Sequence, residues 1–378
     1  MESESSYSSF NSSYQNATFV DPRGPEAVIM PIIMVVIAII AVVGNGLVVY
    51  IVLRFRNMRQ SVTNFYIMNV AVSDLVFVLV CVPLTASLYA TVEWKLGAFL
   101  CKLNAYLQPV AVQATCATLT VMTVDRYYVI MSPFASRRTR TTCRAAIICC
   151  IIWILSALLH IPSAFFYNVE KSYHTNIETK HCFLDTSNEM RLKIYFTYLT
   201  LTTFLIPLVI IGVCYILILM HLWSLTIRNE FDDGNSVKVR SGFMPAAQSP
   251  ARSASKTWKT TRIVLIIVLL FALCWAPIHV INLWRVLSRH YPDSLFNFQM
   301  FALALSYCNS CINPAVYALA GASYKNHLWK MLTGKPHKPS HGQITCPSAT
   351  ASSMYRNTGR RNSNSKTEAT NMSVSTCV

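Results

Sequence analysis

The sequence predicts an all-α membrane protein: a bundle of seven transmembrane helices with a short amphipathic helix after the seventh. Apolar residues make up 53% of the 378 residues and charged residues only 13%, far below the quarter or so that is usual in soluble domains. Seven apolar stretches are each long enough to cross a bilayer, which takes about 20 residues. The net charge of +16 lies mainly between these stretches, which favours contact with anionic lipid and argues against nucleic-acid binding.

The predicted elements follow one another closely along the chain. Residues 1–27 form a polar N-terminal tail, residues 28–320 the transmembrane domain, residues 321–334 the amphipathic helix and residues 335–378 a Ser-, Thr- and Asn-rich tail. We expect that tail and the loop Leu225–Arg262 to be disordered. The seven spans are expected at Val28–Leu53, Phe65–Ala90, Ala98–Met131, Ala145–Tyr167, Ile194–Trp223, Ile263–Leu287 and Phe296–Ala320.

The distribution of basic residues predicts the orientation of the bundle. The segments after spans one, three, five and seven contain 22 Lys or Arg and 4 Asp or Glu, whereas the other segments have no such excess. Basic loops stay on the cytoplasmic side, so we expect an extracellular N-terminus and a cytoplasmic C-terminus in the plasma membrane. The sequons at Asn11 and Asn16 agree, because glycosylation requires the extracellular side.

Two further features follow from this orientation. Of 13 cysteines, only Cys101 and Cys182 fall on the oxidising side away from the middle of an apolar stretch, which predicts a disulfide between them. On the inner side, Leu328, Trp329 and Leu332 have helical spacing beside two lysines. This favours a helix on the inner leaflet over a short helix of the soluble type. Cys346 and Cys377 are candidates for acylation.

Several polar residues lie where burial in a membrane is costly. Asp74 is in the middle of span two, and Asn45, Thr115, Asn309 and Asn313 lie on spans one, three and seven. Together they could hold a small cation, or they could simply join the helices by hydrogen bonds.

At the inner end of span three, Asp125 and Arg126 precede Tyr127. The two opposite charges could neutralise each other, or the arginine could extend to the lipid headgroups. Prolines interrupt five spans and are either hinges or packing residues: Pro83, Pro162, Pro207, Pro277 and Pro314.

Taken together, these motifs resemble those of the rhodopsin-like G-protein-coupled receptors. The resemblance covers about residues 28 to 332 and rests on one motif per helix, in order: Gly44-Asn45, Asp74, Cys101 with Cys182, Asp125-Arg126-Tyr127, Trp153, Pro207 with Tyr215, Cys274-Trp275-Ala276-Pro277 and Asn313-Pro314-Ala315-Val316-Tyr317.

The resemblance implies a receptor, not an enzyme, that binds an agonist outside and activates a heterotrimeric G protein inside. Receptor kinases and arrestin would be further partners. It implies an allosteric sodium site at Asp74, Thr115, Asn309 and Asn313, with no other cofactor. It also implies an activation switch made of Asp125, Arg126, Tyr127, Pro207, Tyr215, Phe271, Trp275, Pro277, Asn313, Pro314 and Tyr317.

Within this family the chain looks like a neuropeptide receptor and is most similar to kisspeptin receptors, with galanin and allatostatin-A receptors next. The similar stretches are Val62–Tyr66, Cys81–Pro83, Leu96–Lys102 and Val112–Tyr127. A kisspeptin-like receptor implies coupling to Gq/11, phospholipase C and calcium release, whereas galanin-type receptors more often use Gi.

The residue at the ligand-facing turn of span three argues for an amidated peptide. Amine receptors of this family carry an Asp there, but this chain has Gln108, which cannot pair with an ammonium ion. Its amide can donate and accept hydrogen bonds, as a C-terminal amide requires. His279 could contact the ligand or be a satisfied core histidine. The predicted ligand-binding residues are Tyr89, Gln108, Val112, Phe183, His279, Asn282, Gln299 and Tyr307.

Kisspeptin-like peptides end in an Arg-Phe amide, so their receptor should offer a carboxylate to the arginine. The outer loops supply Glu93, Glu178, Asp185 and Glu189 as candidates, all of which could equally be solvated surface charges. An opsin is excluded because residues 296–320 contain no lysine for a retinal Schiff base. The short loops and the order of the motifs argue against a transporter.

Overall fold

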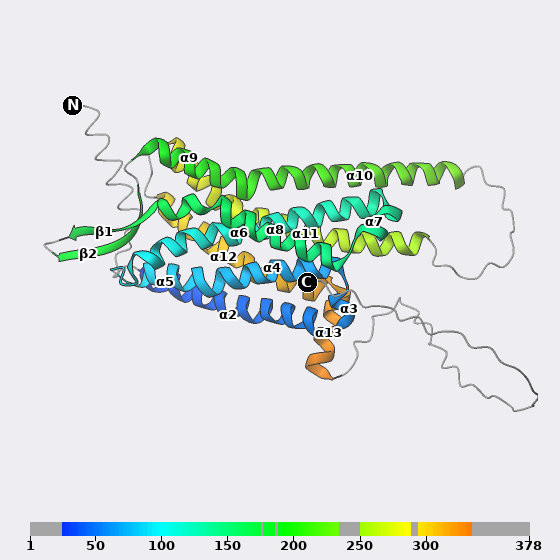
Figure 1. Cartoon of the computed structure of the whole chain (residues 1–378), viewed down its shortest axis with the longest axis horizontal. Helices are drawn as coiled ribbons and strands as arrows, with labels where there is room; N and C mark the ends of the chain where they lie inside the picture. The colour runs from blue at the N-terminus through cyan, green and yellow to red at the C-terminus, as the bar shows by residue number, and fades with distance from the viewer. Residues whose placement is uncertain are drawn as a thin grey trace, which may run out of the picture.

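The computed structural model describes residues 25–91, 93–174, 177–185, 188–233, 250–288 and 294–334. The predicted glycosylation sites Asn11 and Asn16, most of the N-terminal tail and the tail 335–378 lie outside these residues. Within them, seven helical spans run side by side along the long axis of the molecule (Figure 1).

Five spans are each formed by one principal helix: α2 (Pro25–Arg54), α6 (Gly97–Met131), α8 (Thr142–Leu159), α11 (Pro250–Leu287) and α12 (Ser294–Ala320). Span two runs through α4 (Val62–Val76), the π-helical turn η1 (Phe77–Cys81) and α5 (Val82–Ala90). Span five runs through α9 (Glu189–Thr200), the π-helical turn η3 (Leu201–Leu205) and α10 (Ile206–Asp233). Pro83 and Pro207 come two residues after these turns, and a proline cannot donate to the helical ladder, so the irregular turn accommodates it.

Span four ends earlier than the sequence predicted. α8 stops at Leu159 and passes into a 3₁₀ turn, η2 (Ile161–Phe165), whereas the apolar pattern had suggested a helix as far as Tyr167. Pro162 lacks the N–H group that would continue the α-helix. Tyr167 instead begins β1 (Tyr167–His174), which pairs antiparallel with β2 (Ile177–Leu184) in a hairpin that hydropathy did not predict.

The loop between spans five and six is also shorter than predicted. α10 continues to Asp233 and α11 begins at Pro250, so the prediction of disorder over Leu225–Arg262 is wrong at both ends. Residues 234–249 lie outside the described part of the chain.

The outer surface of the bundle is apolar. By length and composition, six of the described helical segments can cross a membrane, and α12 packs among them as the seventh span. Val43 and Leu273 are 66% and 67% exposed, which suits lipid and would be unfavourable in water. Inside, polar bonds also join the spans: the Trp153 indole donates to Asn69 (3.1 Å), whose amide donates to Thr118 (2.7 Å).

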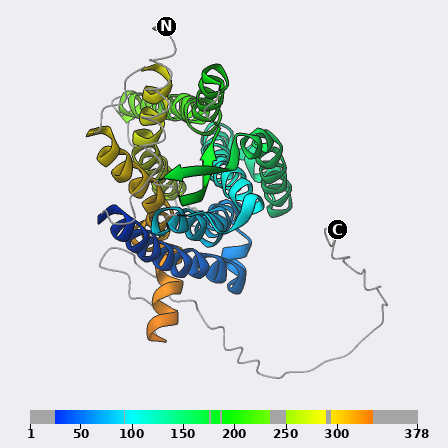
Figure 2. The same ribbon diagram turned by 90° about the vertical axis from the view of Figure 1, so that its left-hand side faces the viewer.

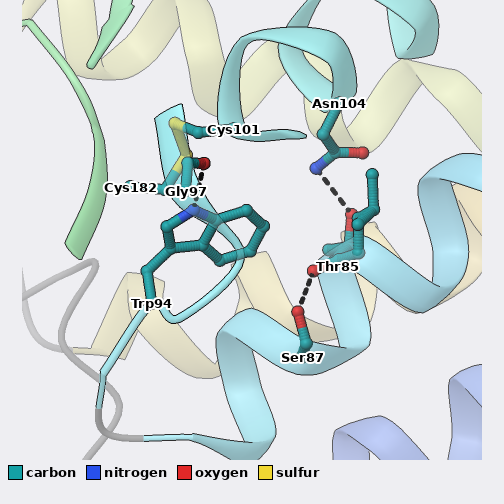
Figure 3. Close-up of a disulfide and its surroundings, with 8 residues drawn as sticks. Thr85, Ser87, Trp94, Gly97, Cys101, Asn104 and Cys182 are labelled. Atoms are coloured by element: carbon teal, nitrogen blue, oxygen red, sulfur yellow. Dashed lines mark hydrogen bonds between the residues drawn. A yellow bond between two sulfur atoms is a disulfide. The ribbon is translucent and has the colours of Figure 1, made fainter. Parts of the chain in front are cut away.

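The hairpin lies over one end of the bundle, which we call the hairpin end (Figure 2). The predicted disulfide between Cys101 and Cys182 is present and joins α6 to β2, with the two Cα atoms 5.7 Å apart (Figure 3). The backbone N–H of Trp94 donates to the carbonyl of Lys180 (2.6 Å), and its indole donates to the carbonyl of Gly97 (2.8 Å). These bonds hold the loop before α6, α6 itself and the hairpin together.

The opposite end carries the short helices α3 (Arg56–Arg59), α7 (Pro133–Thr139) and α13 (Ala322–Thr333), and we call it the α13 end (Figure 1). α13 follows Gly321, where a Cβ atom would lie 2.6 Å from the carbonyl oxygen of Tyr317, so glycine is required for this turn. Leu328 packs against the core, while Trp329 and Leu332 are exposed beside Lys330. The predicted amphipathic helix is therefore present.

Candidate functional site

A cavity of about 320 Å³ lies at the hairpin end between the spans. Helices α5, α6, α9, α11 and α12 form its walls, and the hairpin with the disulfide covers it. Helical spacing in the sequence explains why several of these lining residues face the cavity. Asn104, Gln108 and Val112 follow one another at intervals of four on α6 and so lie on one face of that helix.

The eight residues predicted to bind ligand come from five separate segments, and the fold brings them together. All of them line this cavity: Tyr89, Gln108, Val112, Phe183, His279, Asn282, Gln299 and Tyr307. Trp275, predicted as part of the activation switch, also lines it. Contact of each residue with a ligand stays a prediction that this geometry permits.

The outer-loop carboxylates take other positions. In the described part of the chain, no Asp, Glu, Lys or Arg lines the cavity. Asp185 lies 3.8 Å from the guanidinium of Arg191, and Glu189 lies 2.5 Å from the amine of Lys193. Glu93 is outside the lining, and the side chain of Glu178 is outside the described residues. The carboxylate expected for a ligand arginine is thus not among the lining residues that the structure describes.

The deep wall of the cavity is aromatic. The imidazole of His279 stacks on Phe204 with ring centroids 4.8 Å apart, and its Nδ1 lies 3.3 Å from the hydroxyl of Thr200. Its Nε2 and the indole nitrogen of Trp275 are buried and have no hydrogen-bond partner among the described residues. One nitrogen of His279 is therefore satisfied by the protein, as in a core histidine. The other has no hydrogen-bond partner among the described residues, as a ligand contact would require. Trp275 in turn packs on Phe271, centroid to centroid 6.2 Å.

Two polar residues of the wall were missed by the sequence reading. The amide nitrogen of Asn104 donates to the hydroxyl of Thr85 (3.3 Å), which joins α6 to α5 (Figure 3). Asn104 lies one helical turn before Gln108, so the spacing that placed Gln108 and Val112 in the pocket could also have found it. Thr85 similarly precedes Tyr89 by one turn on α5.

A second polar cluster surrounds Asp74 in the middle of the bundle. Its carboxylate accepts hydrogen bonds from Asn313 (2.9 Å) and Ser310 (3.1 Å). The amide of Asn45 donates to the carbonyl of Ser310 (2.8 Å), so spans one, two and seven are joined there. Thr115 and Asn309 are buried, but the network around Asp74 uses Ser310, which the sequence reading missed.

At the α13 end, Asp125 is shared by two arginines. Its carboxylate lies 3.1 Å from Arg126 and accepts bonds of 2.7 and 2.9 Å from Arg140, which follows α7. Both arginines also donate to the hydroxyl of Thr63, from Arg140 at 3.3 Å. Arg126 is only 5% exposed, so it is paired inside the bundle and does not extend to the lipid headgroups.

The other residues predicted for an activation switch lie on α6, α10, α11 and α12. The hydroxyl of Tyr215 donates to the carbonyl of Thr261 (3.2 Å) and joins α10 to α11. Tyr317 is buried, and its ring centroid lies 6.5 Å from that of Tyr324. Tyr127 is half-buried against the core. The prolines lie at the start of α10 (Pro207) and inside α11 (Pro277) and α12 (Pro314). Their motion on activation stays a prediction.

Comparison with known proteins gives the family. A family model described as 7 transmembrane receptor (rhodopsin family) matches residues 44–317. G-protein coupled receptor 54 of Oreochromis niloticus is 34% identical over 311 residues, which cover 82% of this chain and 79% of the relative. The KiSS-1 receptor of Homo sapiens is 33% identical over 326 residues, covering 84% and 77%. The Allatostatin-A receptor of Bombyx mori is 32% identical over 310 residues, covering 82% and 80%.

The matched region spans the cavity, the Asp74 cluster and the Asp125 cluster, and the relatives are similar over most of both chains. The chain therefore belongs to the rhodopsin family of seven-transmembrane receptors, within its neuropeptide receptor group.

Proposed function

We propose that the chain is a plasma-membrane receptor for an amidated, kisspeptin-like neuropeptide, with the hairpin end extracellular and the α13 end cytoplasmic. The cavity at the hairpin end carries this proposal, because its polar lining offers amides, hydroxyls and imidazoles and, among the described residues, no Asp, Glu, Lys or Arg. Gln108 lies in that lining and can exchange hydrogen bonds with a terminal carboxamide. The similarity to KiSS-1 receptors supports the ligand class.

Signalling would follow from a shift between two populations of the bundle. Peptide bound above Trp275 would favour a state in which α11 tilts about Pro277 and Arg126 leaves Asp125. A G protein, Gq/11 in this proposal, would bind the opened α13 end and activate phospholipase C. Receptor kinases and arrestin would act on the Ser- and Thr-rich tail 335–378. The agonist must bind the open state more tightly for this shift to occur.

The Asp74 cluster would regulate this equilibrium by holding sodium. The carboxylate of Asp74 and the hydroxyl of Ser310 beside it are oxygen ligands of the kind that a hard cation prefers. Asp74, Thr115, Asn309 and Asn313 are the proposed ligands, with Ser310 beside them. If so, raising sodium chloride against a choline chloride control lowers agonist affinity in the wild type and does not in Asp74→Asn.

A second candidate is a galanin- or allatostatin-A-type receptor coupled to Gi. One observation favours it: the described lining has no carboxylate for the arginine of an Arg-Phe amide. The similarity to the Allatostatin-A receptor of Bombyx mori is also nearly as high as that to the KiSS-1 receptor.

One experiment separates these candidates. Cells expressing the full chain are challenged with kisspeptin-, galanin- and allatostatin-A-type peptides and their free acids, while calcium release and inhibition of cyclic AMP are recorded. A calcium response to the kisspeptin-type amide alone supports the first proposal. Inhibition of cyclic AMP by a galanin- or allatostatin-A-type peptide replaces it with the second, and silence to all amidated peptides rejects both.

A further inference from the structure

One wall of the cavity contains four polar residues, and two of them, Asn104 and Tyr307, have a buried atom without a hydrogen-bond partner of good geometry among the described residues. Asn104 and Gln108 lie one turn apart on α6, Thr85 lies on α5 and Tyr307 on α12, and all four line the cavity. Asn104 is 7% exposed and Tyr307 fully buried. Such polar atoms are costly to bury without partners, which is why they indicate a bound group.

A hydrogen bond to α5 favours one orientation of Asn104. Its amide nitrogen donates to the hydroxyl of Thr85, and its carbonyl oxygen Oδ1 points away from that bond (Figure 3). This oxygen is buried and has no hydrogen-bond partner among the described residues. Asn104 therefore carries an unpaired acceptor on a side chain that lines the cavity, and one of its two N–H donors is already engaged.

Tyr307 supplies the complementary group on the same wall. Its hydroxyl is buried within reach of Thr85 and Gln108, and no hydrogen bond of good geometry engages it in the described part of the chain. A tyrosine hydroxyl can donate to a carbonyl oxygen. The wall therefore offers one acceptor and one donor, which match the N–H and the C=O of a primary amide.

We propose that Asn104, positioned by Thr85, is the residue that distinguishes a terminal carboxamide from a free acid. This rests on the proposed function, in which the ligand is an amidated peptide. The ligand N–H donates to Oδ1 of Asn104, and the ligand C=O accepts from the hydroxyl of Tyr307. A terminal carboxylate has only acceptor oxygens, so it would place a negative charge against Oδ1 and leave that oxygen unsatisfied.

Gln108 cannot make this distinction alone. Its amide is half-buried and can present either its oxygen or its nitrogen, so it can bind an amide or an acid. Asn104 differs because the hydrogen bond to Thr85 engages one of its two N–H donors and favours one orientation of its amide. Gln108 therefore adds affinity, whereas the pair Asn104 and Thr85 adds selectivity.

The test is the ratio of potencies of an amidated peptide and its own free acid. We would use an Arg-Phe-amide peptide of the kisspeptin type and an allatostatin-A-type amide, each with its acid, on the full chain in cells. Because both members of a pair are measured on one variant, the ratio does not depend on the amount of receptor at the surface. Asn104→Leu removes the acceptor and should lower the ratio at least tenfold. Asn104→Asp keeps an acceptor and should preserve the preference for the amide.

Thr85→Val is the second variant, which tests the positioning. It is isosteric, leaves Asn104 in place and frees it to turn its nitrogen toward the ligand, so the ratio should fall here too. Ser87→Ala is the matched control on the same helix, because the Ser87 hydroxyl donates to the carbonyl of Leu84 and lies outside the cavity lining.

The possible outcomes distinguish a failure of the Asn104 assignment from a failure of the proposed receptor function. An unchanged ratio in Asn104→Leu, or in Thr85→Val if Asn104→Leu fails to reach the surface, overturns the assignment of Asn104 and leaves the receptor proposal intact. Equal potency of the amide and the acid on the wild-type receptor also overturns the assignment of Asn104 and leaves the receptor proposal intact. A wild-type receptor that answers no amidated peptide overturns the proposed function as well.

Discussion

Gln108 shows how one side chain limits the class of ligand. It lies half-buried in the wall of the cavity and offers hydrogen bonds without charge. Replacing it with alanine should weaken the response to an amidated peptide by about 1–3 kcal/mol, or roughly 5- to 150-fold in the half-maximal concentration. Phe99→Ala is the control, since Phe99 lies on the same helix with an exposed side chain outside the lining. Superimposable dose–response curves for Gln108→Ala and wild type would remove Gln108 from the binding site.

Arg140 leads to a second prediction at this scale. Its two bonds to Asp125 join the segment after α7 to span three, and it shares Thr63 with Arg126. Arg140→Ala removes these bonds and leaves Arg126 less firmly held, so signalling without peptide should rise several-fold. Arg138→Ala, an exposed residue of α7, should leave it unchanged. Accumulation of inositol phosphates in untreated cells measures the basal signalling of each variant. Equal basal values for Arg140→Ala and Arg138→Ala would contradict the role of Arg140.

The sequence could identify some of these residues and not others. Gln108, Val112, His279 and Tyr307 follow from helical spacing once the spans are known, and the structure places them around one cavity. The partners of charged and polar groups were harder to predict. That Ser310 bonds to Asp74, or that Thr63 accepts from Arg126, depends on how far one helix is shifted and rotated against another. Spacing within a single helix does not contain that information.

At the scale of helices, the contact between spans one and seven depends on Gly44. A Cβ at this position would lie 3.0 Å from both Cβ and Cγ of Pro314, and the proline ring cannot rotate away. Gly44→Ala should therefore separate α2 from α12 and destabilise the purified protein by about 1–3 kcal/mol. Gly46→Ala is a matched control, because a Cβ there meets nothing within 4 Å.

Thermal unfolding in detergent measures this difference. The Tm of Gly44→Ala should fall, while that of Gly46→Ala should stay level or rise slightly, since alanine favours a helix interior over glycine by about 0.5–1 kcal/mol. If the two variants have the same Tm, the close approach of Gly44 to Pro314 does not limit the packing of α2 against α12.

Helical elements were predicted well and the hairpin was not, for a physical reason. Apolar stretches of bilayer length identify spans from local composition alone. The strands β1 and β2 contain mostly polar or charged residues, and they pair through backbone bonds while one of them is tied to α6 by the disulfide. Pairing of that kind depends on chain topology and a covalent bond, and hydropathy reports neither.

At the scale of the whole molecule, the orientation in the membrane stays a prediction from the loop charges and the sequons. Asn371 begins a further sequon, Asn371-Met372-Ser373, in the predicted cytoplasmic tail. If the N-terminus is extracellular, Asn11 and Asn16 carry glycans and Asn371 does not. Digestion with an N-glycosidase should then increase the gel mobility of the wild type and of Asn371→Gln. The double variant Asn11→Gln/Asn16→Gln should show no change. A shift that depends on Asn371 would reverse the orientation.

The neutral lining of the cavity has a consequence for pharmacology. Compounds aimed at amine receptors carry a basic nitrogen. This nitrogen is charged at physiological pH and must lose its hydration shell before it binds. A cavity of about 320 Å³ with amide, hydroxyl and imidazole groups can instead be filled by a small uncharged carboxamide. Such a molecule would cross cell membranes more readily than a peptide. Screening for synthetic ligands of this receptor should therefore begin with neutral libraries.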